Sequence, residues 1–243
     1  MTIPLSHDTL ILLEQFHQSF PRFYAQFVST EVQLQNLKFA YQIYQQRCAV
    51  LFTRLESDKT VLYFGHRNSP FLMTDIFGVL AAYGLTIHNL NVYGQIKAPM
   101  LVFLRITLTR GDAPLTDKLA ENVKKALRET LMGKFDVETM LANEFNLDSP
   151  LKKVDTSFYI DRVVQLPSLL VEANSEPAFF YKVMRSLSQE DLLVISANLL
   201  VWRGRTRLIL YLLGANQNLI PEHLGHKIAL SIQERLGGTT VAS

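Results

Sequence analysis

The feature that most constrains the fold of this chain is a segment that occurs twice. Residues 67–94 and residues 173–204 each contain an apolar strand-like run, an Asn or Ser loop before a proline, an amphipathic helix and a second β-rich stretch. A repeated strand–loop–helix–strand unit predicts two related domains. Because neither copy carries an evident catalytic set, the repeat favours a sensor or an interaction module over an enzyme.

Hydrophobic periodicity extends the pattern beyond the repeat. Apolar residues recur at helical spacing within residues 72–83, 119–131, 179–187 and 224–236, and they alternate strictly from Met100 to Leu108. We therefore expect an α+β protein with two ferredoxin-like domains, each of order βαββαβ. The predicted organisation is a helical lead-in over residues 1–47, a first domain over 48–150 and a second over 151–243, with a strand at 157–165 as a candidate to complete the first sheet.

Composition limits which partners and which cellular compartment are expected. Apolar residues make up 48% of the chain, and 24 basic residues against 22 acidic ones give a net charge of +2. That balance favours neither a nucleic-acid partner nor a membrane surface. The single Cys48 fits a reducing compartment, and the N-terminal sequence lacks the basic start and apolar core of a signal peptide. The expectation is a cytoplasmic protein.

The two proline loops carry a family resemblance. The first reads Asn-Ser-Pro-Phe-Leu-Met over residues 68–73, and the second reads Ser-Glu-Pro-Ala-Phe-Phe over residues 175–180. Both resemble the strand–helix loop of ACT domains, which are small-molecule-binding regulatory modules. The segment at residues 20–43 is similar to the stretch before the paired ACT domains of bifunctional uridylyltransferase/uridylyl-removing enzymes, whose catalytic motifs this chain lacks.

The resemblance implies a non-catalytic regulatory protein that binds an amino acid where two domains pair. It also implies a homodimer, a regulatory protein partner and a place in nitrogen or amino-acid control, with no cofactor and no metal. Backbone N–H groups at a helix N-terminus suit the ligand carboxylate. The candidate ligand-binding residues lie in the two loops and the strands that follow them: Asn68, Ser69, Asn89, Asn91, Ser175, Glu176, Ala178, Phe179, Ser196 and Asn198.

The sequence departs from the family pattern at the loop glycine, which is replaced by Phe71 and by Ala178. Phe71 is expected to crowd or fill the first site, whereas Ala178 leaves more room in the second. An alternative interpretation is that the loop residues merely cap the helices, as Asn and Ser often do. The chain would then be a ligand-free dimerisation or protein-interaction module.

Two further groups of polar residues have simpler interpretations. His223 and His226 lie three residues apart on a predicted helix, but no third ligand is evident, so a solvated helix face is favoured over a zinc site. Arg203, Arg205 and Arg207 surround Gly204 and are typical of a charged hairpin tip, with phosphate contact as the alternative.

Overall fold

The computed structural model describes residues 14–46, 49–54, 58–98, 100–147 and 149–237, so Cys48 lies outside the described residues. Its strands form one eight-stranded antiparallel sheet in the order β1-β2-β4-β3-β7-β8-β6-β5. The strands are β1 (Ala49–Arg54), β2 (Thr60–Arg67), β3 (Leu85–Gly94), β4 (Leu101–Arg110), β5 (Asp155–Ile160), β6 (Pro167–Asn174), β7 (Leu192–Trp202) and β8 (Arg205–Gly214).

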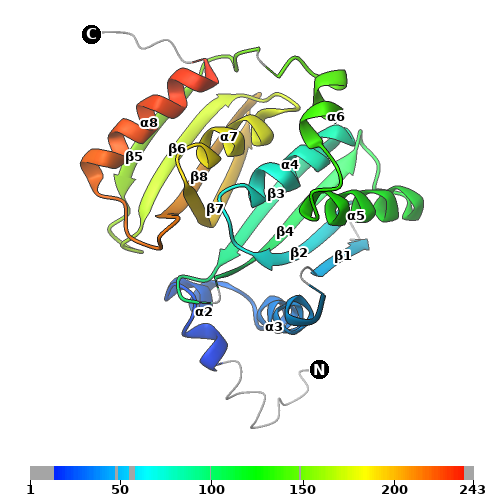
Figure 1. Cartoon of the computed structure of the whole chain (residues 1–243), viewed down its shortest axis with the longest axis horizontal. Coiled ribbons are helices and arrows are strands. Elements are labelled where there is room, and N and C mark those ends of the chain that lie inside the picture. The colour runs from blue at the N-terminus through cyan, green and yellow to red at the C-terminus, as the bar shows by residue number, and fades with distance from the viewer. Residues whose placement is uncertain (1–13, 47–48, 55–57, 99, 148, 238–243) are drawn as a thin grey trace.

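The helices lie on both faces of this sheet but serve different parts of it. They are α2 (Phe23–Phe27), α3 (Thr30–Gln46), α4 (Leu72–Ala82), α5 (Asp117–Leu131), α6 (Val137–Glu144), α7 (Phe179–Ser188) and α8 (Glu222–Leu236). Helices α4, α5, α7 and α8 form a layer over one face, which we call the helix-covered face (Figure 1). None of the helices in the described ranges has the length and apolar character needed to cross a membrane.

The predicted fold class of two ferredoxin-like domains of order βαββαβ is wrong. The chain forms a first unit from β1 to α6 and a second unit from β5 to α8. Each begins with two strands and follows the order ββαββα, and the first unit adds α6 at its end. In the first unit, β1 folds back on β2 in register from Ala49↔Gly65 to Arg54↔Thr60. That pairing already occupies the free edge of β2, where a strand following the second helix would otherwise pair.

The two units also share one sheet instead of forming two. Strands β3 and β7 pair antiparallel through three registers: Asn91↔Asn198, Val92↔Ala197 and Tyr93↔Ser196. We call this pairing the seam. Strand β5 pairs with β6 and so extends the second unit. A single cluster of buried apolar side chains runs beneath α4, α5, α7 and α8 and contains residues of both units.

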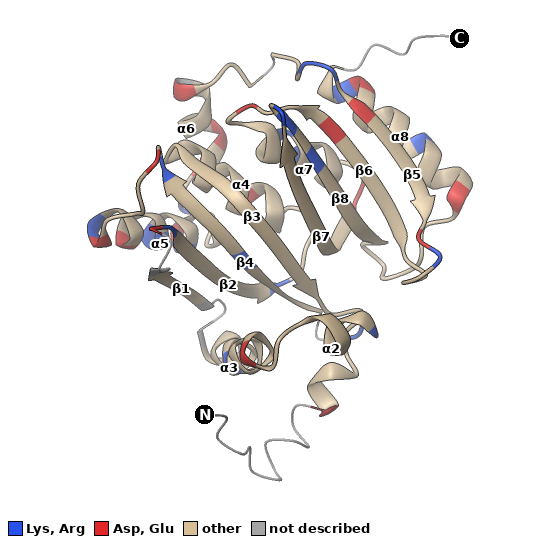
Figure 2. Cartoon of the chain, turned by 180° about the vertical axis from the view of Figure 1, so that it is seen from behind, with Lys and Arg blue, Asp and Glu red and all other residues tan. Residues whose placement is uncertain are grey.

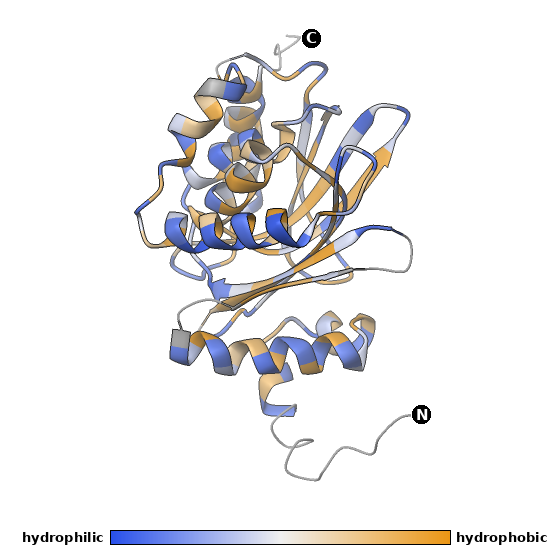
Figure 3. Cartoon of the chain, turned by 90° about the vertical axis from the view of Figure 1, so that its right-hand side faces the viewer, coloured by the Kyte–Doolittle hydropathy of each residue, from blue (hydrophilic) through white to orange (hydrophobic). Residues whose placement is uncertain are grey.

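The helix boundaries follow from local chemistry. Thr116 caps α5, because its side chain accepts a hydrogen bond from the backbone N–H of Leu119 at 3.3 Å. Gly237 ends α8 in the left-handed region with φ of 96°, which a residue without a side chain adopts readily. In the side view one layer of helices lies beside the sheet and α3 lies apart from it on the other side, with apolar residues concentrated in the strands (Figure 3).

On the opposite face of the sheet, the helices of the described residues lie over the first unit and reach the second unit only at the seam. There, Phe16, Phe20 and Tyr24 pack with Phe39 of α3 against Phe103 of β4. Figure 2 shows this face from behind, with α2 and α3 beside the first unit and the second unit's strands without a helix over them.

Candidate functional site

A cavity of about 450 Å³ lies on the helix-covered face where the two units meet. We call it the junction cavity. The first unit contributes the end of α4, the start of β3 and one side chain from the segment after α6. The second unit contributes the β6–α7 loop and residues of β7 and β8. Its lining residues are Phe77, Ala81, Gly84, Leu85, Thr86, Ile87, Phe145, Ser175, Glu176, Pro177, Phe180, Val201 and Thr206.

Aromatic packing forms the inner wall of the junction cavity. Phe77 of α4 stacks on Phe180 of α7 with ring centroids 5.4 Å apart and an interplanar angle of 19°. Phe180 also meets Phe179 edge-on at 5.3 Å. Both helices present these rings because their apolar residues recur at helical spacing, and the rings join the two units at this wall.

The polar groups of the junction cavity come mainly from the β6–α7 loop. The backbone N–H of Ser175 donates to the carbonyl of Gly204 at 2.8 Å, and the Ser175 and Thr206 hydroxyls lie 2.8 Å apart. One carboxylate oxygen of Glu176 accepts from the backbone N–H of Lys152 at 3.3 Å. These hydrogen bonds fix the loop. Glu176 is the charged side chain among the lining residues of the junction cavity.

The matching loop of the first unit is closed by its own contacts. The backbone N–H of Asn68 donates to the Met100 carbonyl at 2.7 Å, as Ser175 does to Gly204. The Asn68 amide then donates across the seam to the carbonyl of Val194 at 3.0 Å. Ser69 is exposed, and Phe71 is 59% exposed. Phe71 therefore does not fill this loop as expected, because its side chain faces solvent.

The remaining predicted residues are distributed over different surroundings. Ala178 and Phe179 are buried and do not line the junction cavity. Asn91, Ser196 and Asn198 line a different cavity on the opposite face of the sheet, and Asn89 on the same strand is exposed. Alternation along a strand sends successive side chains to opposite faces, so the loops and these strand residues cannot share one site.

Of the lining residues of the junction cavity, only Ser175 and Glu176 were predicted as site residues; Phe77, Thr86, Phe180 and Thr206 are among those that were not. The two phenylalanines look like ordinary core residues in a helical pattern. Thr86 and Thr206 lie far from the second proline loop in sequence. Thr86 reaches the cavity through the pairing of the two units, and Thr206 reaches it through the pairing of β6 with β8. The repeated segment is the sequence feature that could have pointed to this cavity, because it indicated that two copies of the unit could pack together.

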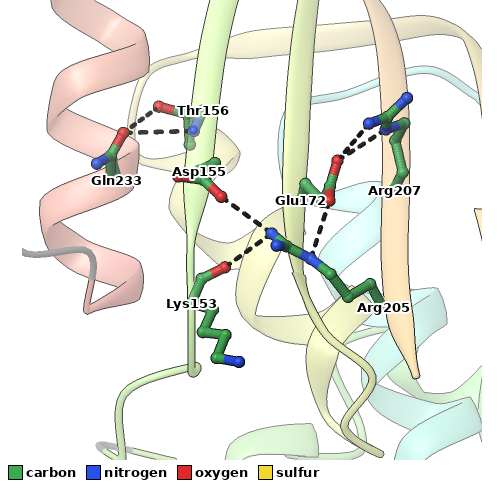
Figure 4. Close-up of polar contacts among 7 residues, drawn as sticks. All are labelled: Lys153, Asp155, Thr156, Glu172, Arg205, Arg207 and Gln233. Atoms are coloured by element: carbon green, nitrogen blue, oxygen red, sulfur yellow. Dashed lines mark hydrogen bonds and ion pairs between the residues drawn. The ribbon is translucent and has the colours of Figure 1, made fainter. Parts of the chain in front are cut away.

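The arginines around Gly204 belong to an ion-pair network instead of a phosphate site. Arg205 contacts Asp155 of β5 and Glu172 of β6, each at 2.9 Å, and Arg207 contacts Glu172 at 2.7 Å (Figure 4). Arg203 lies over the ring of Trp202 at 4.5 Å. Since the carboxylates of Asp155 and Glu172 pair with Arg205 and Arg207, the network links β5, β6 and β8.

A larger cavity of about 760 Å³ borders α6, but three of its charged groups, Asp136, Glu138 and Arg185, already have partners. Asp136 accepts hydrogen bonds from the backbone N–H groups of Glu138 and Thr139 and thereby caps α6. Arg185 pairs with Glu138 at 3.1 Å. Within the described residues, no group of three or more His, Cys, Asp or Glu side chains is placed to hold a metal ion.

Comparison with known proteins adds little to this description. No protein-family model matches the chain, and no curated protein matches it. Among solved structures, the fused permuted hexameric shell protein from the RMM microcompartment matches with 9% sequence identity. The match covers 79% of this chain and 89% of that one, with a TM-score of 0.25, which is too low to carry weight for fold or function.

Proposed function

We propose that this chain is a non-catalytic sensor that binds an amino acid with an apolar side chain in the junction cavity. One observation carries the proposal. The Glu176 carboxylate and the hydroxyls of Thr86, Ser175 and Thr206 line a cavity that is otherwise mostly apolar and lies between the two units. A mostly apolar pocket with a few convergent polar groups is the usual form of a small-molecule site.

The lining suggests how such a ligand would lie. An ammonium group would pair with Glu176, because a charge-assisted hydrogen bond is the strongest contact available among these residues. The apolar side chain would pack against Phe77 and Phe180. The ligand carboxylate would meet the hydroxyls and the N-terminal end of α7, where helix geometry favours negative charge.

Sensing follows from the position of the junction cavity. Its walls come from both units, so a ligand that contacts both would favour the arrangement in which they close on it. A ligand shifts an equilibrium only by its differential affinity for the two states. The choice of an amino acid and the link to nitrogen or amino-acid control rest on the family resemblance of the proline loops.

Calorimetric titration with a panel of apolar amino acids tests the proposal. We expect binding by the intact chain and affinity about tenfold lower or worse in Glu176→Gln, since that variant loses the charged acceptor. Glu234→Gln, at an exposed position on α8, is the matched control and should bind as the wild type does. Absence of heat with every amino acid, or full affinity in Glu176→Gln, would refute the amino-acid assignment.

A second candidate function is protein interaction, including homodimer formation. The end of β7 exposes two apolar side chains on one face of the sheet, Leu200 and Trp202, at 56% and 64%. Exposed apolar clusters of this kind mark contact surfaces. Light scattering on the purified chain and on Trp202→Ala distinguishes the cases: a dimer that dissociates in the variant supports this function, and a monomer at every concentration contradicts it.

A further inference from the structure

A second cavity lies on the other face of the sheet, at the seam. Its volume is about 390 Å³, and it is bounded by α2, the paired strands β3 and β7, β8 and the loop after β5. We call it the seam cavity. Its lining residues are Phe23, Phe27, Val28, Asn91, Val92, Tyr93, Val164, Ser196, Ala197, Asn198 and Tyr211.

The floor of the seam cavity is polar but uncharged. Asn91 and Asn198 are register partners across the seam, and Ser196 pairs in register with Tyr93 two residues along. The Asn91 and Asn198 side chains form no hydrogen bond with any residue in the described ranges. Each amide offers an acceptor and two donors, so the pair presents both kinds of group side by side.

One wall is a pair of phenylalanines on a firmly held helix. Tyr24 anchors α2, because it stacks on Phe20 with ring centroids 3.9 Å apart and its hydroxyl accepts from the Asn36 amide at 2.9 Å. Phe23 and Phe27 extend from the same helix to the cavity, and Phe27 is 78% exposed. A large apolar ring held in solvent beside a cavity loses unfavourable exposure when a ligand covers it.

The opposite wall is Tyr211 with the loop after β5. The Tyr211 hydroxyl donates to one carboxylate oxygen of Asp161 at 3.0 Å, and the other oxygen accepts from the backbone N–H groups of Val163 and Val164. Asp161 thus holds the Tyr211 ring against the loop after β5. The Tyr211 ring lies 6.1 Å from that of Phe23, inclined by 42°.

We propose that the seam cavity binds a neutral, planar heterocycle of the nucleobase class, as a free base or a nucleoside. No charged side chain is among its lining residues, which disfavours an ionic ligand. Aromatic rings on the walls provide the stacking surfaces that bases use, and Asn amides match the paired donors and acceptors on a base edge. This site is independent of the junction cavity, because the two lie on opposite faces of the sheet.

The test is equilibrium dialysis and ligand-observed NMR with adenine, uracil, adenosine and uridine. We expect at least one of them to bind the intact chain. Affinity should fall about tenfold or more in Asn91→Ala/Asn198→Ala, which removes the hydrogen-bonding edge. It should fall about fivefold or more in Phe27→Ala, which removes a stacking surface. Circular dichroism would establish that both variants are folded, as expected for partly or fully exposed positions.

Two controls make the result specific. Phe71→Ala removes another exposed phenylalanine that lies outside the seam cavity, and Glu176→Gln alters the junction cavity. Both should bind the heterocycle as the wild type does. No binding of any of the four compounds overturns the proposal. Full affinity for the heterocycle in the Asn91→Ala/Asn198→Ala variant also overturns it. Loss of affinity in Glu176→Gln overturns it as well, because that result would place the ligand in the junction cavity on the other face of the sheet.

Discussion

Asn68 of the first unit donates a hydrogen bond across the seam to the carbonyl oxygen of Val194, at 3.0 Å. This carbonyl lies on β7 at the position where the register of β7 with β8 shifts, between Val194 and Ser196. A shift of this kind leaves backbone groups without their regular ladder partners. The side chain of Asn68 thus supplies a hydrogen bond where β7 departs from regular pairing, and it joins the two units there.

Asn68→Ala should therefore destabilise the fold. We expect a loss of about 1–2 kcal/mol in the free energy of unfolding, because a partly buried carbonyl loses its donor. Urea denaturation followed by circular dichroism measures the change. Ser69→Ala, at the neighbouring exposed position, should alter stability by less than about 0.5 kcal/mol. Equal stability of the two variants would show that the Asn68 contact contributes nothing.

The stacked pair Phe77 and Phe180 should couple the two units energetically. A double-mutant cycle with Phe77→Leu and Phe180→Leu isolates their interaction, which we expect to be about 0.5–1.5 kcal/mol. Chemical denaturation of the wild type, the two single variants and the double variant gives the four free energies required. Additive losses would mean that each ring packs independently and that the stack does not join the units.

Asp75 should make stability depend on pH. Burial raises the pKa of this carboxyl from near 3.8 to about 6 in the folded chain. The folded state then binds the proton more tightly than the unfolded state does, so stability from this group is greatest below pH 3.8. That contribution is lost as pH rises through about 6.

Asp75→Asn removes this titration and should stabilise the chain by about 1–2 kcal/mol at pH 8, after allowance for solvent screening. The gain should vanish below about pH 4. Thermal denaturation from pH 4 to pH 8 measures it. Asp117→Asn, at the exposed start of α5, serves as the control and should show no such gain. A pH-independent difference at position 75 would contradict the assignment to burial.

Gly225 should tolerate no side chain. A Cβ built at this position of α8 would overlap the ring of Phe158 on β5. Gly225→Ala is expected to lower stability by about 1–3 kcal/mol, although alanine is the better helix former. His223→Ala, at an exposed position on the same helix, should be nearly neutral. Thermal unfolding of the two variants compares them, and a more stable Gly225→Ala would show that α8 can shift away from β5.

Periodicity in the sequence was enough to place most of the elements. The helical spacing within residues 72–83 and 179–187 corresponds to α4 and α7, and the alternation from Met100 to Leu108 corresponds to β4. Gly84 follows α4 with φ of 63°, the left-handed conformation in which a glycine commonly ends a helix. These features are local, since each depends only on residues within a few turns of one another.

The order of the strands could not be obtained in this way. The same elements permit β1 to pair with β2 or a later strand to take that place, and the antiparallel register of β1 with β2 decides it. For this reason the sequence pointed to βαββαβ, whereas each unit is ββαββα. Strand pairing depends on contacts between distant residues, which hydrophobic patterns do not specify.

The repeated segment alone established that the chain has two related units and that their proline loops differ. Tertiary structure decided what those differences mean. Asn68 closes one loop by bonding to Val194, whereas Ser175 bonds locally to Thr206 beside an open cavity. Tertiary structure also placed Ser175 and Glu176 in one cavity and Asn91 and Asn198 in another. Pairing at the seam fixes which face of the sheet Asn91 and Asn198 lie on.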